Sequence, residues 1–197
     1  MNVFYEDLPE TLKINGKEYP IITDFREWIR FSDMLKSDLQ PQYKLEFLAE
    51  MFLEDAPDLY TEEGVEEVMD SITSFLSLEA LEFPNQYSDE LEEVEYKDAT
   101  EKKAIYYEQD APYIISAFRR EYQVNLLSVP YMHWWEFRML LDGLSEESQI
   151  KKRIYWRTCD VSKMEKKERM EILKIRRSIT IPEEEYVSDE DIGNAFM

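Results

Sequence analysis

Cysteine, histidine and glycine are scarce in this 197-residue chain, which contains one cysteine, one histidine and four glycines. Because Cys159 is the sole thiol, an internal disulfide and a zinc site built from several cysteines are both excluded. His133 has no second histidine with which to form a metal site, so we expect it to be packed and hydrogen-bonded. The glycines are isolated from one another and form no glycine-rich phosphate loop. We therefore predict no catalytic, cofactor-binding or metal-binding residue, and a protein that is not an enzyme.

Long apolar runs and positive charge are also lacking. No stretch approaches the length of a membrane span, and the first residues do not have the basic and apolar segments of a secretory signal. The 44 acidic side chains outnumber the 23 basic ones and give a net charge of −21. Such a charge repels nucleic acids and anionic membranes. We therefore expect a soluble intracellular protein whose partners are neutral, apolar or basic proteins, and neither nucleic acid nor membrane.

The chain does contain enough apolar material for a folded core. Apolar residues make up 44% of it and aromatic residues 14%, which excludes a largely disordered chain. Near the N-terminus, Asn15 and Gly16 separate two short alternating runs within residues 12–22, a pattern typical of a β-hairpin with a two-residue turn. A hairpin of this size needs a helix to pack against.

Elsewhere, apolar residues recur at helical spacing and predict a mainly α fold. We expect six to seven helices in one compact, bundle-like domain that includes the small N-terminal β-hairpin. The domain spans residues 1–181, with an acidic loop at about 79–109, and an acidic tail at 182–197 is expected to be disordered. The expected helix starts are Thr23 or Asp24, Pro41, Asp58 to Thr61, Asp110, Ser128, Ser145 and Ser162.

The densest apolar stretch, residues 128–157, contains three of the four tryptophans and is expected to form two helices around a break at Gly143. At about 100° per residue, Trp134 lies on the core-facing side of the first helix. Trp135 lies on roughly the opposite side, among polar neighbours. Two interpretations of Trp135 remain open, namely a second layer of the same core or a surface that binds a partner.

Residues 145–177 hold eleven basic and six acidic side chains, so this segment is positive in an otherwise acidic chain. It is the one candidate for nucleic-acid binding, but Glu–Lys and Glu–Arg pairs at helical spacing favour charge matching within the protein or with another protein. The last helix has only a thin apolar edge. The predicted partner-binding residues are Tyr131, Trp135, Arg138, Met164, Ile172 and Ile175.

Several short motifs, taken in order, resemble the bacteriophage Gp15 family of tailed phages and prophages of Gram-positive hosts. The motifs are His133-Trp134-Trp135, Gly143-Leu144-Ser145 and Ile154-Tyr155-Trp156-Arg157, together with Leu8-Pro9 and with Asp110 leading into Tyr113-Ile114. The short hairpin before an aromatic helix is also similar. The resemblance covers about residues 5–180.

The resemblance implies a tail assembly chaperone, because genes of this family usually lie between those for the tail tube and the tape-measure protein. Such a protein would coat the long apolar tape-measure chain while tube subunits polymerise around it, in the cytoplasm of the infected or lysogenic host cell. The expected partner is the tape-measure protein, and tail tube subunits and further copies of the chain are additional candidates. The resemblance implies no catalytic residue. The alternative role is a structural tail or connector protein of the virion.

Overall fold

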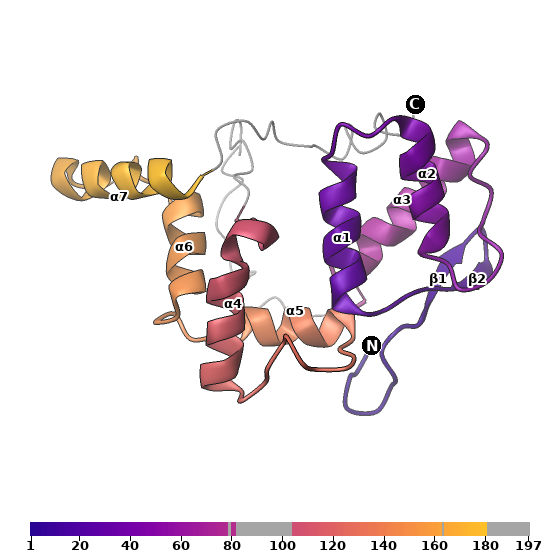
Figure 1. The fold of residues 1–197 in the computed structure, drawn as a ribbon, viewed down its shortest axis with the longest axis horizontal. Coiled ribbons are helices and arrows are strands. Elements are labelled where there is room, and N and C mark those ends of the chain that lie inside the picture. The colour runs from indigo at the N-terminus through magenta and orange to yellow at the C-terminus, as the bar shows by residue number, and fades with distance from the viewer. Residues whose placement is uncertain (79, 82–103, 163, 181–197) are drawn as a thin grey trace, which may run out of the picture. The chain divides into compact units, whose positions relative to one another are not determined.

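A computed structural model of the chain describes residues 1–78, 80–81, 104–162 and 164–180. This part of the chain is mainly α, as predicted, with seven helices and one two-stranded antiparallel sheet (Figure 1). The elements are β1 (Thr11–Ile14), β2 (Lys17–Pro20), α1 (Phe25–Leu35), α2 (Pro41–Glu50), α3 (Glu62–Leu76), α4 (Tyr107–Glu121), α5 (Trp134–Asp142), α6 (Gln149–Thr158) and α7 (Lys166–Ile179). The tail and most of the acidic loop predicted from the sequence lie outside the described residues.

The described residues group into two compact units. Unit 1 contains 1–78, 80–81 and 131–138, and unit 2 contains 104–130, 139–162 and 164–180. The first part of α5 thus belongs to unit 1 and its last part to unit 2. Because two compact units can belong to one domain, this grouping does not test the single-domain assignment, which stays a prediction.

The predicted hairpin is formed by β1 and β2 in unit 1. Asn15 and Gly16 form its turn with φ angles of 51° and 77°, the left-handed conformation that asparagine and glycine adopt at least cost. The hairpin packs on α3, where the Ser71 hydroxyl donates a hydrogen bond of 3.0 Å to the Lys13 carbonyl and the Asn15 side-chain amide donates to Glu67. These contacts supply the support that a two-stranded sheet cannot supply for itself.

The three helices that follow the hairpin begin where the sequence predicts. The Asp24 side chain caps α1 by accepting from the Arg26 amide at 2.9 Å. Pro41 opens α2, and the Thr61 hydroxyl caps α3 by accepting from the Gly64 amide at 3.2 Å. In Figure 1, α1 and α2 lie side by side. Local capping chemistry is therefore sufficient to locate these helix starts.

Aromatic rings fill the centre of unit 1. Trp28 of α1 is fully buried, and its ring centroid lies 4.8 Å from that of Phe75 on α3. Phe25 of α1 stacks on Phe137 of α5 with ring centroids 4.5 Å apart. Each buried aromatic side chain removes on the order of 150–250 Å² of surface from water, so these contacts dominate the stabilisation of the unit.

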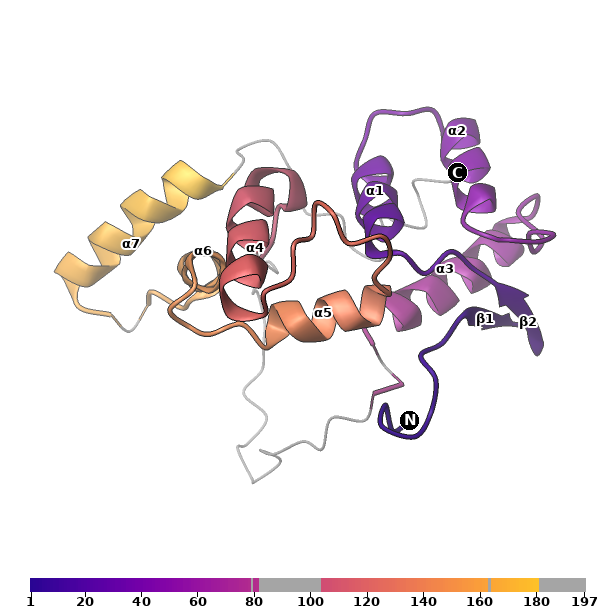
Figure 2. The ribbon, with the colours of Figure 1, turned by 60° about the horizontal axis from the view of Figure 1, so that its bottom comes forward.

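Unit 2 is built from α4, α6 and α7 together with the last part of α5. Figure 2 shows α4 and α6 next to each other, with α7 following α6 along the chain. The prediction that Asp110 caps a helix is wrong, because α4 begins at Tyr107 and Asp110 lies inside it. Its carboxylate is fully buried and accepts from Arg153 at 2.8 Å, from Arg157 and from the Tyr106 amide at 3.0 Å.

Asp110 forms ion pairs with Arg153 and Arg157 and does not cap the helix. Burial by itself would raise the pKa of the Asp110 carboxyl, but hydrogen bonds from Arg157, from the Tyr106 amide and from Arg153 outweigh it and lower the pKa. The resulting stabilisation is fully present above the unfolded pKa, about 3.9, and is lost as the pH falls below that value through the folded one. The two arginines lie more than forty residues along the chain, beyond the reach of local pattern analysis.

Two other predicted caps in unit 2 are misplaced by three residues. The Ser148 hydroxyl, not that of Ser145, caps α6, while Ser145 is held by the Glu121 carboxylate at 2.9 Å and 3.1 Å. Ser162 forms a local turn with Asp160, and α7 begins at Lys166 after Glu165. Ser145 and Ser162 do not cap these helices, because each has another hydrogen-bond partner.

Replacing Asp110 with alanine leaves two buried arginines without their carboxylate. We expect the free energy of unfolding to fall by about 3–5 kcal/mol, measured by chemical denaturation at neutral pH. The matched control is Glu108→Ala, which removes an exposed carboxylate from the same helix and should cost roughly 0.5 kcal/mol or less. Equal losses for the two variants would contradict a structural role for the Asp110 ion pairs.

Candidate functional site

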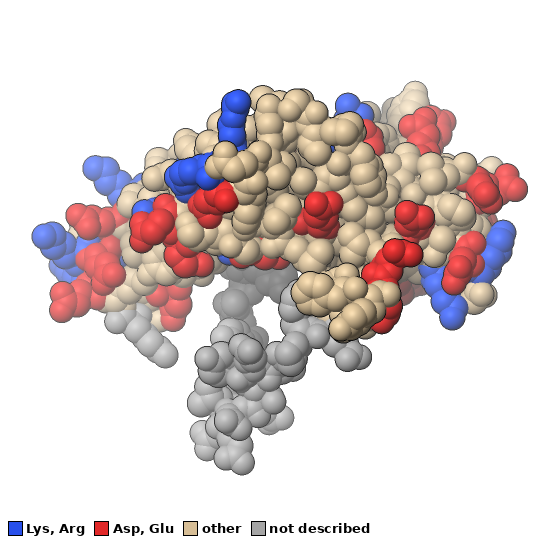
Figure 3. Space-filling model, turned by 90° about the horizontal axis from the view of Figure 1, so that it is seen from below, with Lys and Arg blue, Asp and Glu red and all other residues tan. Residues whose placement is uncertain are grey.

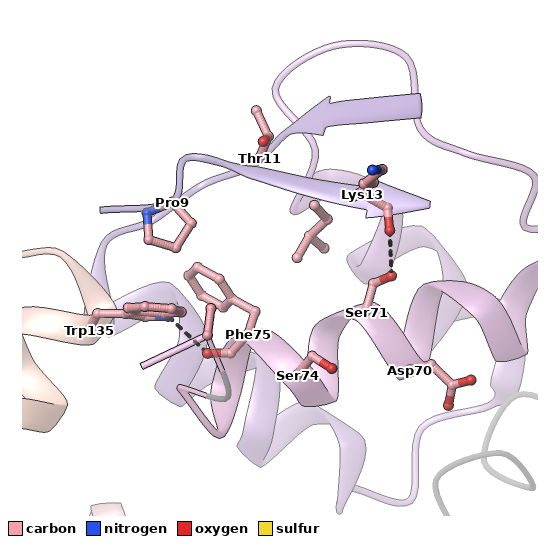
Figure 4. Close-up of a pocket in the computed structure, with 10 residues that line it drawn as sticks. Pro9, Thr11, Lys13, Asp70, Ser71, Ser74, Phe75 and Trp135 are labelled. Carbon is pink, nitrogen blue, oxygen red and sulfur yellow. Dashed lines mark hydrogen bonds between the residues drawn. The ribbon is translucent and has the colours of Figure 1, made fainter. Parts of the chain in front are cut away.

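An open groove of about 460 Å³ lies in unit 1 between β1 and the C-terminal half of α3 (Figure 4). Its lining comes from three parts of the unit that are far apart in the sequence. The lining residues are Pro9, Thr11, Leu12, Lys13, Asp70, Ser71, Ser74, Phe75, Ala80 and Trp135. The groove is mainly apolar, with polar groups along its two walls, and its composition suits binding better than chemistry.

One wall of the groove is the outer edge of β1. Thr11 pairs with Pro20, and Lys13 pairs with Glu18. Counted from the two-residue turn, the alternation of an antiparallel ladder makes both of these pairs non-hydrogen-bonded. The backbone N–H and C=O groups of Thr11 and Lys13 therefore point away from β2. The hydrogen bond from Ser71 to the Lys13 carbonyl agrees with this orientation (Figure 4).

The floor of the groove is aromatic. The Trp135 indole Nε1 donates a hydrogen bond of 2.9 Å to the Phe75 carbonyl, and the two ring centroids lie 5.9 Å apart (Figure 4). Only 1% of Trp135 is exposed. A second layer of the core is therefore the interpretation of Trp135 that its position supports, and its cover comes from α3. Its edge nevertheless borders the groove.

The unit that contains the groove is acidic. Unit 1 carries 19 acidic and 7 basic described side chains, a net charge of −12, whereas unit 2 carries 10 acidic and 12 basic ones, a net of +2. The groove lining itself holds one acidic residue, Asp70, and one basic residue, Lys13. On the face shown in Figure 3, acidic side chains are scattered among large areas without charged groups. The groove thus favours apolar or basic ligands over acidic ones.

His133 connects the groove to the start of α5. Its Nδ1 accepts from the Trp135 amide at 3.0 Å, and its Nε2 lies 3.0 Å from the Pro9 carbonyl. A neutral imidazole with its hydrogen on Nε2 satisfies both contacts. The prediction of a packed, hydrogen-bonded histidine is therefore confirmed. The predicted cap at Ser128 is wrong, because α5 begins at Trp134 and the imidazole takes the capping role.

The other predicted contact residues are divided between the units. Tyr131 is 51% exposed, and its hydroxyl lies 2.8 Å from that of Thr23. The Arg138 guanidinium lies over the Trp134 ring, 5.5 Å from its centroid. In unit 2, Ile172 is buried, while Met164 and Ile175 are partly exposed. Of the six, only Trp135 lines the groove, and partner binding by the set stays a prediction.

Most of the residues that line the groove are not among the contact residues predicted from the sequence. Asp70 and Ser74 are spaced four apart on the side of α3 away from its buried stripe, which is a visible signal of an exposed polar face. Alternation likewise places Thr11 and Lys13 on the exposed side of β1, opposite the buried Leu12. Neither pattern indicates that β1 and α3 lie beside each other, so the groove itself has no local signature.

No three histidine, cysteine, aspartate or glutamate side chains in the described ranges gather closely enough to hold a metal ion. None of the helices described is both long and apolar enough to cross a membrane.

Replacing Trp135 with alanine removes a ring that packs on Phe75 and a donor to its carbonyl. We expect a loss of about 3–5 kcal/mol in the free energy of unfolding, because a large buried side chain leaves a cavity. Tyr60→Ala is the matched control, since Tyr60 is a fully exposed aromatic residue of the same unit and its loss should be nearly neutral. If both variants unfold at the same denaturant concentration, Trp135 is not a core residue.

Stability should also depend on the protonation of His133. Burial lowers the pKa of its imidazole, and this outweighs the opposing effects of the Pro9 carbonyl and of Glu10 and Glu136. The stabilisation from the neutral ring is therefore fully present above the unfolded pKa, about 6.5, and is lost as the pH falls through that value towards the folded one. In urea titrations from about pH 8 to pH 5, the wild type should lose stability more steeply than His133→Asn, which keeps a capping acceptor but does not titrate. Parallel pH profiles would contradict this assignment.

A match to a known protein family covers most of the chain. A family model described as Bacteriophage Gp15 protein matches residues 4–181. That range contains the hairpin, the seven described helices and every residue that lines the groove. No curated protein and no solved structure matches the chain. Because the match covers most of its length, the chain belongs to the bacteriophage Gp15 family.

Proposed function

We propose that this protein is a tail assembly chaperone without catalytic activity, which holds the tape-measure protein in the host cytoplasm while the tail tube forms. Membership of the Gp15 family indicates the coarser role, a structural protein of a phage. The observation that carries the finer proposal is the open, aromatic-floored groove in the acidic unit 1. A chaperone needs such a contact surface together with a charged exterior that keeps the complex soluble.

The dimensions of the groove suit reversible binding. At about 460 Å³ it can accept one or two side chains of a client, and not a whole folded element. Its aromatic floor is largely buried already, so a client adds little new apolar contact at each copy. Modest affinity per copy is what release of the client during tube assembly requires. Many copies along one long client would then give strong retention overall.

Co-expression with fragments of the tape-measure protein from the same phage or prophage tests this proposal. We expect at least one fragment to co-purify with the chain, and Ser74→Trp to reduce its retention about tenfold by filling the groove. Thr73→Trp is the matched control, because Thr73 is the exposed neighbour of Ser74 on α3 and does not line the groove.

Failure to retain any fragment would contradict the chaperone role. Mass spectrometry of purified virions then separates the alternative, since a structural tail or connector protein remains in finished particles and an assembly chaperone does not.

A further inference from the structure

We propose that the outer edge of β1 binds an extended, basic client segment as a third strand that pairs with Thr11. This inference rests on the proposed function, because the client is taken to be the tape-measure protein. The observations that carry it are the hydrogen-bonding direction of Thr11, the groove beside it and the net negative charge of unit 1.

The position of the added strand is set by the backbone groups of β1. The Pro9 carbonyl is engaged by His133, and the Lys13 carbonyl is engaged by Ser71. Thr11 lies between these two points, and the register directs its N–H and C=O away from β2 at the groove. One client residue opposite Thr11 can therefore accept from its amide and donate to its carbonyl, as in an antiparallel bridge.

The two edges of the hairpin differ in the backbone contacts that they make with the rest of unit 1. On the β2 side, Ile21 forms a bridge with Phe52, and the Leu53 amide donates to the Pro20 carbonyl at 3.0 Å. Beside β1, α3 contributes only the Ser71 side chain to the strand backbone among the described contacts. An edge that presents outward backbone groups beside a groove is a template for strand addition.

The groove runs along β1 and α3. The contacts of Asn15 with Glu67 and of Lys13 with Ser71 advance in opposite directions along the two elements, so β1 and α3 run antiparallel. Phe75 and Asp70 are five residues apart on α3, which turns their side chains about 140° from each other around the helix. A client strand beside β1 therefore faces the Phe75 side of α3 and not Asp70.

Charge selects among the occupants of the groove. Lys13 and Asp70 are the two charged residues that line the groove, and unit 1 carries a net charge of −12 among its described residues. The chain's own segment after Pro182 carries six acids and no base, which is the wrong sign for this unit. A basic, apolar segment of another protein is the occupant that the charges favour.

The test uses the full chain and a tape-measure fragment retained in the co-expression experiment. Thr11→Pro removes the outward N–H but spares the β1–β2 ladder, because Thr11 and Pro20 are not a hydrogen-bonded pair. We expect Thr11→Pro to weaken binding of the fragment about tenfold, and the control Thr11→Val, which keeps the N–H, to bind within about twofold of the wild type.

Amide hydrogen exchange of the wild-type chain supplies a readout that needs no substitution. We expect exchange of the Thr11 amide to slow about tenfold when the fragment is added. Undiminished binding by Thr11→Pro, or an unchanged exchange rate at Thr11, would overturn strand addition while leaving the chaperone role intact. If the wild type binds no tape-measure fragment, both proposals fall together.

Discussion

The hydrogen bond from the Trp135 indole to the Phe75 carbonyl is the contact on which the candidate site depends. It joins the start of α5 to the end of α3, and the two rings that it brings together, those of Trp135 and Phe75, are both buried. His133 lies two residues before Trp135. Its imidazole accepts from the Trp135 amide and contacts the Pro9 carbonyl, which joins the same helix start to Pro9. The floor of the groove and the entry to β1 are therefore held by neighbouring side chains of one short motif. Its donors and acceptors are satisfied within unit 1, which keeps the cost of burying them low.

In unit 2, a buried carboxylate is likewise satisfied by hydrogen bonds from within the unit. Asp110, buried in α4, receives hydrogen bonds from Arg153 and Arg157 of α6, and the Arg157 guanidinium also donates to the Ile179 carbonyl at the end of α7. A buried carboxylate is tolerated because each of its oxygens is paired with a guanidinium. These bonds connect α4, α6 and the end of α7, and they add to the contacts of the two apolar side chains that α7 buries, Ile172 and Ile179.

The two units also differ in what they offer to other molecules. Unit 1 combines strong negative charge with an outward strand edge and an apolar groove, features that together favour an extended apolar or basic peptide. Unit 2 is close to neutral among its described residues. Unit 1 is therefore the part of the chain to which the proposed client binding is assigned. Binding there would place the negative charge of the chain around an apolar client and keep the complex soluble.

The sequence by itself determined the mainly α class, the Asn15-Gly16 turn and the starts of α1 to α3, because these depend on periodicity and capping within a few residues. Helical phase also separated Trp135 from the first core face, but left its environment open. Only the tertiary structure decided that Trp135 is covered by α3, that Asp110 is an ion-pair partner and not a cap, and that β1 lies along α3 to leave a groove. Each of these depends on contacts between residues more than forty positions apart, and such contacts leave no trace in local sequence patterns.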